Sequence, residues 1–265
     1  NVAPEVESSY IPHAVDGDIF TSLDPKDIAR IKIEKGLGNK FVCFWNSRNA
    51  RRKQSGTLIW WFKEFLDRVG HDKACLIMHT DVKDVHGQDL EAIVHELGLV
   101  NGEVMFSQQK VNNTDLALMY NMADVTACIS DAEGFGLSTL ESLSCGTPII
   151  VTMTGGLQDQ VTDGENWYGI GLEPASKAII GSQQVPYIYE DRLSKDDFLD
   201  ALEKIYNMSA KERHELGQKG AKWSRDFFGF DKFVERWDEL FTRIYEERGS
   251  WDTREKYTPY EVKVF

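Results

Sequence analysis

Short apolar runs alternate with amphipathic stretches along most of the chain. Five runs have strand length and consist mainly of apolar residues, at Phe41–Trp45, Cys75–His79, Val104–Phe106, Val125–Ile129 and Pro148–Val151. Between them lie four stretches with helical spacing, at Thr57–Val69, Gln88–Leu97, Asp115–Met122 and Leu137–Cys145. Nearly continuous apolar strands separated by helices are typical of a parallel sheet covered on both faces. The pattern therefore predicts a Rossmann-like, doubly wound α/β fold.

The pattern changes after Gly169. Residues Pro174–Arg192 contain Pro, Gly, Ser and Gln, and this composition predicts a long irregular excursion. Extra helices are expected after it. Ser194, followed by acidic residues, has the pattern of a helix N-cap, and Ser209 with Glu212 matches a capping box.

A last helix is predicted from Asp231 to about Arg248. Its aromatic-rich face consists of Phe233, Trp237, Leu240, Phe241, Ile244 and Tyr245. An apolar face of this size needs a cover, which indicates a partner domain or an oligomer. The tail that follows, residues 249–265, has no clear period and receives no assignment.

Composition limits the possible partners. The net charge of −13 argues against nucleic acid or an anionic membrane surface as the main partner. No apolar run approaches the ~20 residues that span a bilayer, and no signal peptide opens the sequence. We therefore expect a cytoplasmic protein without a transmembrane segment.

The cysteines form no CxxC pair and are expected to be buried free thiols: Cys43, Cys75, Cys128 and Cys145.

The most informative segment runs from Asp131 to Glu141. It places Glu133 and Glu141 eight positions apart around a Gly-Phe-Gly turn, between a predicted strand and a predicted helix. Backbone N–H groups of such a turn approach an anion closely, and the helix dipole favours negative charge. The flanking carboxylates accept hydrogen bonds from hydroxyls but cannot hold phosphate. The segment therefore predicts a ligand with phosphate in the middle and sugar hydroxyls at each end, as in a nucleotide-sugar.

A basic cluster follows the first predicted strand. It contains Arg48, Arg51, Arg52 and Lys53 within six positions. Ligands of open α/β sheets bind at the carboxyl ends of strands, so a local anion site is expected here. Fixed cations would stabilise the charge that develops on a leaving nucleoside diphosphate without a metal ion. The alternative is a solvated basic loop. The histidines show no metal-ligand spacing, so no metal site is predicted.

Five motifs in this order resemble the donor-binding half of a retaining GT-B glycosyltransferase. They are Tyr10–Asp16, Tyr120–Val125, Glu133–Glu141, Cys145–Pro148 and Gly155–Asp159. The family is the large, glycosyltransferase family 4-like group with an E-x7-E motif, which includes sucrose, starch and lipopolysaccharide transferases. The resemblance implies that residues 1–248 form the C-terminal, nucleotide-sugar-binding half of a GT-B fold. It also implies that helix 231–248 packs on the first half or on a partner.

The resemblance implies a role for each site residue. In the family's motif the first glutamate contacts the transferred sugar, and the second holds ribose. The corresponding residues here are Glu133 and Glu141, in that order. An arginine and a lysine after the first strand hold the diphosphate; Arg48 and Lys53 match best, with Arg52 as the substitute. The backbone at the helix N-terminus would assist, through Gly134, Phe135, Gly136 and Leu137.

The sequence departs from the family's pattern in three places. Asn46-Ser47 stands where Gly-Arg is usual, which leaves the choice of arginine open. Ala14 stands where Gly is common, and Asp159 where Glu is frequent; we assign Asp159 no chemistry.

The resulting prediction is a metal-independent glycosyltransferase domain that needs no cofactor. It would transfer a sugar from a UDP- or GDP-sugar, with retention of configuration, to a glycan, lipid or small-molecule acceptor. The resemblance implies that the chain begins at the linker into the second half, so activity is expected to need an absent acceptor-binding domain or a homo-oligomer partner. The alternatives are a GT-B-type epimerase or phosphorylase, and a non-catalytic sugar-nucleotide-binding or assembly module.

Overall fold

A six-stranded parallel sheet forms the centre of the computed structural model, which describes residues 7–250 and 252–253. Its spatial order is β3-β2-β1-β4-β5-β6. The strands are β1 (Phe41–Asn46), β2 (Ala74–His79), β3 (Val104–Ser107), β4 (Val125–Cys128), β5 (Ile149–Thr152) and β6 (Gly169–Leu172). The strand order reverses between β1 and β4, and ligands of open α/β sheets bind at the carboxyl ends of the strands at such a switch point.

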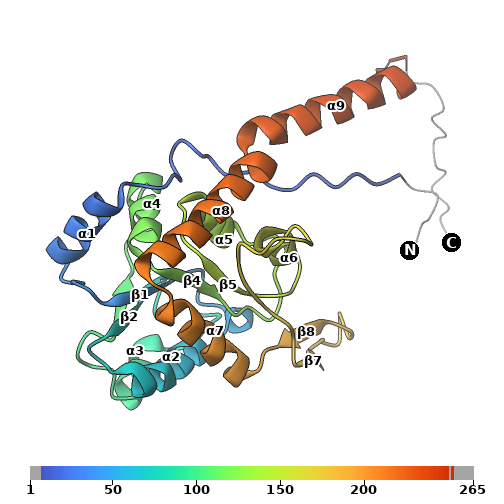
Figure 1. Ribbon diagram of the computed structural model, residues 1–265. Coiled ribbons are helices and arrows are strands. Elements are labelled where there is room, and N and C mark those ends of the chain that lie inside the picture. Colours follow the sequence, from blue (N-terminus) through green and yellow to red (C-terminus); the bar gives the residue numbers. More distant parts are fainter. Residues whose placement is uncertain (1–6, 251, 254–265) are drawn as a thin grey trace.

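Helices cover both faces of the sheet (Figure 1). In chain order they are α1 (Pro25–Glu34), the 3-10 helix η1 (Arg51–Lys53), α2 (Ser55–Val69), α3 (Leu90–Glu96), α4 (Asn113–Met122), α5 (Leu137–Ser144), α6 (Leu157–Val161), α7 (Lys195–Asn207), α8 (Ala210–Phe228) and α9 (Phe230–Arg248). The prediction of a Rossmann-like, doubly wound α/β fold with extra C-terminal helices is confirmed.

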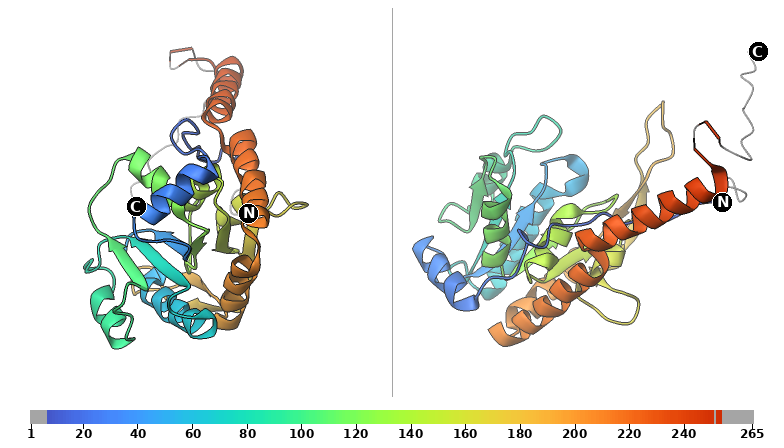
Figure 2. Two further views of the ribbon diagram at one scale, coloured as in Figure 1. Left: turned by 60° about the vertical axis from the view of Figure 1, so that its left-hand side comes forward. Right: turned by 90° about the horizontal axis from the view of Figure 1, so that it is seen from above.

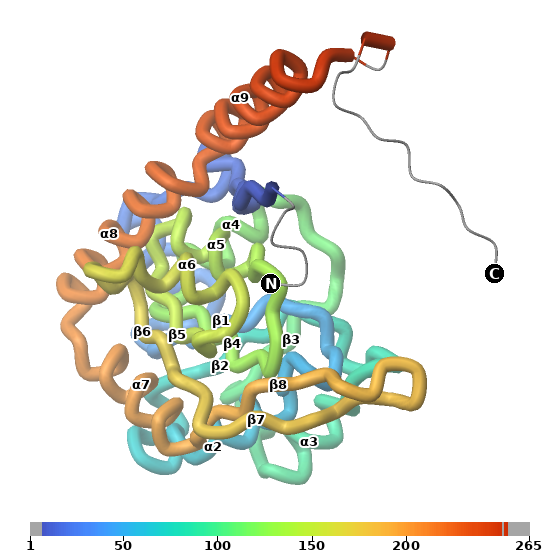
Figure 3. Tube along the Cα trace, turned by 90° about the vertical axis from the view of Figure 1, so that its right-hand side faces the viewer, coloured from blue at the N-terminus to red at the C-terminus, as the bar shows by residue number. Residues whose placement is uncertain are grey.

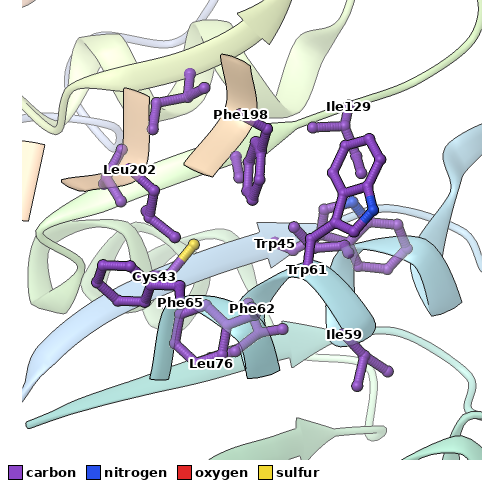
Figure 4. Packing of buried hydrophobic residues seen from close by; sticks show 14 of the residues in the cluster. Cys43, Trp45, Ile59, Trp61, Phe62, Phe65, Leu76, Ile129, Phe198 and Leu202 are labelled. Carbon is purple, nitrogen blue, oxygen red and sulfur yellow. The ribbon is translucent and has the colours of Figure 1, made fainter. Parts of the chain in front are cut away.

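Alternating side chains of β1 build the cores on the two faces of the sheet. Cys43 and Trp45 pack on one face with Phe62 of α2 and Phe198 of α7 (Figure 4). Phe44 lies in a second cluster on the other face, with side chains of α4, α5 and α8. Each of these residues is at most 1% exposed. The burial of β1 on both faces explains why its sequence is almost wholly apolar.

The hydrophobic pattern located the central elements correctly. All five predicted strands and the four helices between them are present, with ends that differ by at most two residues from the prediction. The predicted caps are also present: the Ser194 hydroxyl caps α7, and Ser209 and Glu212 form a capping box at α8. The four cysteines are buried and free, as expected.

The expectation of an irregular excursion over Pro174–Arg192 is wrong. Strands β7 (Ser176–Ile179) and β8 (Tyr189–Arg192) pair antiparallel in a separate two-stranded sheet. Their exposed outer positions give no alternation of apolar and polar residues, which is the signal that predicts a strand. Helices α1 and α6 and strand β6 were also not predicted. β6 reads Gly-Ile-Gly-Leu, in which two glycines obscure the apolar run.

Helix α9 extends away from the rest of the molecule (Figures 1 and 3). None of its residues is buried, and its exposed apolar side chains are Phe230, Val234, Phe241, Ile244 and Tyr245. The prediction that this helix packs on a further domain or partner therefore stays a prediction. Residues 251 and 254–265 of the tail lie outside the described residues. Among the residues described, no helix has both the length and the apolar character needed to cross a bilayer.

Gly217 sets the distance between α8 and the end of α5. A Cβ atom on Gly217 would lie 1.8 Å from the carbonyl oxygen of Gly146. Helix propensity alone favours alanine over glycine by about 1 kcal/mol. We expect the opposite for Gly217→Ala, a loss of about 2 kcal/mol or more in the free energy of unfolding, because backbone must move. Urea denaturation measures this.

Gly220→Ala, in the same helix, provides the control. Its Cβ would meet the Cδ2 methyl of Leu143 at 2.6 Å, and a side-chain methyl group can move more easily than backbone. A Gly217→Ala variant as stable as Gly220→Ala would contradict the proposed packing.

Candidate functional site

Two loops meet at the carboxyl ends of β1 and β4. The first contains η1, and the second runs from Ile129 to the start of α5. The backbone N–H of Asp131 donates to the carbonyl of Arg52 at 2.8 Å, and the Gln54 side-chain amide donates to the Asp131 carboxylate at 2.6 Å. These bonds hold the basic segment beside the first glutamate of the predicted motif.

Lys53 and Glu133 form an ion pair at this junction. The Lys53 ammonium donates to Glu133 Oε1, and the two side chains are only 12% and 7% exposed. The Ser130 hydroxyl donates to the same carboxylate at 3.0 Å. Arg52 Nη1 lies 3.4 Å from Glu133 Oε2 and also donates to the Ala132 carbonyl. The structure thus brings together three of the predicted residues, Lys53, Arg52 and Glu133.

Glu141 lies in the second turn of α5 and accepts a hydrogen bond from Tyr120. The Tyr120 hydroxyl donates to Glu141 Oε2 at 2.7 Å and accepts from the Asn46 side-chain amide at 2.8 Å. Burial raises the pKa of Glu141, and the Tyr120 hydrogen bond opposes that shift. This carboxylate is therefore oriented by a fully buried tyrosine, and Asn46, at the end of β1, completes the chain.

The Gly-Phe-Gly turn is held from α6. The Gln160 side-chain amide donates to the carbonyls of Phe135 and Gly136 at 2.8 and 3.0 Å, and Gln160 is fully buried. Gly136 is the N-cap of α5 with φ of 89°, a left-handed conformation that favours glycine. Among the described residues no side chain caps α5, so no side-chain acceptor occupies its first backbone N–H groups.

Gly155 packs directly against the backbone of Glu133. Its φ is +51°, and a Cβ atom there would lie 1.8 Å from the Glu133 carbonyl oxygen. The next residue, Gly156, donates its N–H to the Gly134 carbonyl at 3.0 Å. The Gly-Gly pair after β5 therefore allows close approach of backbone to backbone, which fixes the position of the glutamate loop.

A pocket of about 440 Å³ lies next to this turn. The segment that leads into the domain forms one wall, with Tyr10 and His13, and the glycine turns form the other. The His13 and Phe135 rings meet edge to face with centroids 5.1 Å apart. The Phe135 ring also packs on Phe228, with ring centroids 5.8 Å apart, which anchors the turn to the core.

Arg48 lies apart from the other predicted cations. Its guanidinium forms two hydrogen bonds to the Asp84 carboxylate, at 2.6 and 3.1 Å, and its side chain is 60% exposed. The same pairing holds the pKa of Asp84 near 2. The geometry therefore favours Arg52 over Arg48 as the arginine nearest to the glutamate loop.

A network of charges beside the site was not predicted from the sequence. Arg51 forms two hydrogen bonds to Glu190 of β8, at 2.9 and 2.7 Å, and Arg192 pairs with Asp131 at 3.0 Å and with Glu190 at 3.2 Å. The hydrogen bonds from Arg51 lower the pKa of Glu190. Arg51 was recognised only as one member of the basic cluster; its partner is about 140 residues away, and no local pattern indicates such a pair.

The arrangement combines cations, free backbone donors and two carboxylates within one edge of the sheet. The cations and the N-terminus of α5 suit a diphosphate, and the carboxylates suit hydroxyl groups. No three His, Cys, Asp or Glu side chains within the described part of the chain are placed to share a metal ion. Metal independence nevertheless stays a prediction.

A family model described as "Glycosyl transferases group 1" matches residues 27–223. The chain belongs to this family. It is 32% identical over 200 residues to a D-inositol 3-phosphate glycosyltransferase from Arthrobacter sp. (strain FB24), a match that covers 70% of this chain and 42% of the relative. It is 31% identical over 169 residues to a GDP-mannose-dependent α-(1-6)-phosphatidylinositol monomannoside mannosyltransferase from Mycolicibacterium smegmatis, covering 61% and 42%. The chain thus spans less than half the length of these relatives.

Solved structures agree with the fold. A sucrose-phosphate synthase from Thermosynechococcus elongatus superposes with a TM-score of 0.69 at 21% identity, covering 89% of this chain and 52% of the enzyme. The separately crystallised C-terminal domain of a group 1 glycosyl transferase from Francisella tularensis superposes with a TM-score of 0.62 at 20% identity, covering 82% of this chain and 99% of that domain. The architecture therefore matches the fold of that separately crystallised C-terminal domain.

Burial of Glu141 predicts a gain in stability when its charge is removed. Because its folded-state pKa is raised, Glu141 favours the folded state most below its ordinary pKa of 4.5 and loses this contribution as pH rises through the folded value. Glu141→Gln keeps an oxygen for Tyr120 but carries no charge. We expect Tm at pH 7 to rise by about 2–4 °C, the shift for ~1 kcal/mol in a chain of this size.

Thermal unfolding between pH 7 and pH 4.5 measures this effect. The difference between Glu141→Gln and the unmodified protein should narrow as pH falls, because Glu141 itself becomes protonated. A lower Tm for the variant at pH 7 would contradict the assignment of Glu141 as a destabilising buried carboxylate.

Proposed function

We propose that this chain is the donor-binding domain of a retaining, metal-independent glycosyltransferase that uses a nucleoside-diphosphate sugar. The observation that carries the proposal is the convergence of Lys53, Arg52 and Glu133 beside the uncapped N-terminus of α5, with Glu141 in the same helix. Cations and backbone donors meet the diphosphate there, while carboxylates meet the hydroxyls of ribose and sugar.

The relatives support this class of donor. One curated relative is named as GDP-mannose-dependent, and an Anabaena protein of similar fold, at 17% identity and a TM-score of 0.66, was crystallised with UDP-glucose. Two relatives are named for their substrates, which are D-inositol 3-phosphate and a phosphatidylinositol monomannoside. These names support glycosyl transfer as the reaction class of this chain.

In the proposed reaction the protein supplies positioning and charge. The bond between the sugar and the diphosphate breaks, and negative charge develops on the β-phosphate. Lys53 and Arg52 stabilise that charge because they are held in place before the reaction begins. Glu133 orients the sugar and Glu141 the ribose. An acceptor hydroxyl, positioned with the help of an acceptor-binding domain or a partner, forms the new bond to the anomeric carbon, and its proton passes to the leaving diphosphate. The free thiols are usual in a reducing compartment, which supports a cytoplasmic location.

Calorimetric titration of this chain with UDP, GDP and ADP tests donor binding. We expect one diphosphate to bind selectively, with the same affinity when a chelator is present. Lys53→Ala and Arg52→Ala should each weaken binding by about tenfold or more, because a charge-assisted hydrogen bond is worth ~1.5–3 kcal/mol. Arg48→Ala is the matched control, since its guanidinium is paired with Asp84 in the free protein.

The outcomes separate the competing assignments. A larger loss for Arg48→Ala than for Arg52→Ala would return the diphosphate role to Arg48 and require the loop to rearrange on binding. No binding of any of the three diphosphates would contradict donor binding by this chain and favour an interaction module.

Glu133 pairs with the cations of the candidate site, and this pairing predicts an unusual gain of affinity. In Glu133→Gln, Lys53 keeps its position but loses a competing carboxylate. We expect bare UDP or GDP, whichever the protein prefers, to bind about fivefold more tightly, or ~1 kcal/mol. Transfer by the complete enzyme should fall, because the carboxylate that orients the sugar is lost.

Glu173→Gln, on an exposed residue after β6, removes the same charge outside the ion pair and is the control. Weaker binding of the bare diphosphate to Glu133→Gln than to Glu173→Gln would disprove the competition between Glu133 and phosphate.

A further inference from the structure

The β7–β8 hairpin is fixed beside the candidate donor site. The backbone N–H of Asp191 donates to the Asp131 carbonyl at 2.8 Å, and Glu190 of β8 is held by Arg51 from η1. Asp131 lies only two residues before Glu133. The base of the hairpin is therefore attached to both loops of the site, while its tip extends to the outside of the molecule (Figures 2 and 3).

The outer part of the hairpin carries no charge. Residues 178–189 read AIIGSQQVPYIY, without Asp, Glu, Lys or Arg, in a chain that is 28% charged. The exposed fractions of its large side chains are 59% for Ile179, 52% for Val185, 75% for Tyr187 and 61% for Tyr189. Exposed apolar side chains gathered in one place mark a binding surface more often than an ordinary solvated loop.

Backbone hydrogen bonds keep these side chains in a defined arrangement. Ile179 is directly opposite Tyr189, so their side chains share one face of the hairpin. Beyond the strands the pairing continues, with the N–H of Ile180 donating to the Ile188 carbonyl at 2.9 Å. A Cβ atom on Gly181 would lie 2.1 Å from the Pro186 carbonyl oxygen, so the two arms touch at the tip. The backbone that carries Tyr187 and Tyr189 is therefore held in a defined conformation before any ligand binds.

We propose that residues 178–189 form a carbohydrate-binding platform that contacts the acceptor. A sugar ring has an apolar C–H face and a rim of hydroxyls. Tyrosine rings with polar hydroxyl ends fit the first, and the side chains of Ser182, Gln183 and Gln184 can hydrogen-bond the second. The assignment of this ligand as the acceptor rests on the proposed glycosyltransferase function. Carbohydrate binding by the hairpin does not depend on that function.

The charge pattern distinguishes this ligand from others. The absence of cations between residues 178 and 189 disfavours a phosphate or an acidic peptide. An anionic membrane surface is disfavoured by the same absence and by a net charge of −13. A neutral ligand with both apolar and hydroxylated surfaces fits this composition, and the attachment of Glu190 and Asp191 to the site loops places the base of the platform beside the proposed donor site.

A glycan array printed with gluco-, manno- and galacto-oligosaccharides, followed by saturation-transfer NMR with the best binder, tests the platform. The double variant Tyr187→Ala/Tyr189→Ala should bind that oligosaccharide at least about tenfold more weakly, or ~1.4 kcal/mol. Tyr187→Trp/Tyr189→Trp should retain binding, because the aromatic faces remain. Trp60→Ala, which removes a 47% exposed aromatic ring from α2, is the control and should bind normally.

Titration of the same variants with UDP and GDP separates this proposal from the proposed function. Unchanged nucleotide binding together with lost oligosaccharide binding supports the platform. The platform proposal is overturned if the unmodified chain binds no oligosaccharide, or if the alanine variant binds it equally well. This holds whatever the nucleotide titration shows. If the unmodified chain binds neither UDP nor GDP, the donor-binding proposal is overturned instead. Tyrosine-dependent binding to phosphatidylcholine or phosphatidylinositol vesicles without oligosaccharide binding would replace the carbohydrate with a membrane.

Discussion

The contact between the two loops at the carboxyl ends of β1 and β4 determines the rest of the site. A backbone hydrogen bond from Asp131 to Arg52 and a side-chain bond from Gln54 to Asp131 hold these loops together. Through them the basic segment faces the glutamate loop, and the β7–β8 hairpin is attached to both. Without this contact the cations would occupy a solvated loop, because nothing in η1 itself fixes their direction.

Gly155 and Gln160 also support the site, although neither belongs to the two loops that meet there. Gly155 allows the loop after β5 to touch the backbone of Glu133, and the buried Gln160 amide satisfies two carbonyls of the Gly-Phe-Gly turn. Positions of this kind decide where a carboxylate points. A catalytic geometry depends on such supporting residues as much as on those that touch the substrate.

The sequence predicted those features that local patterns encode. The central strands follow from apolar runs such as Val125–Ile129, and the glutamate pair follows from its spacing around two glycines. Arg51 and Glu190 could not be paired, because a contact between positions so far apart depends on the assembled fold. Nor could the partners of Arg48 and Arg52 be told apart, because Asp84 and Glu133 lie on other segments of the chain and no local pattern indicates either pair. The β7–β8 hairpin was missed because most of its residues are exposed, so burial leaves no period in its sequence.

The ion pair between Lys53 and Glu133 also bears on which anions the candidate site attracts. With Lys53 already paired with Glu133, the site offers inorganic phosphate less free positive charge than its two cations alone would. A ligand that brings phosphate alone must separate the pair, and leaves a poorly exposed carboxylate without a partner. A ligand that brings phosphate and hydroxyls satisfies both members at once. The pair thus makes recognition conditional on two chemical groups arriving in one molecule.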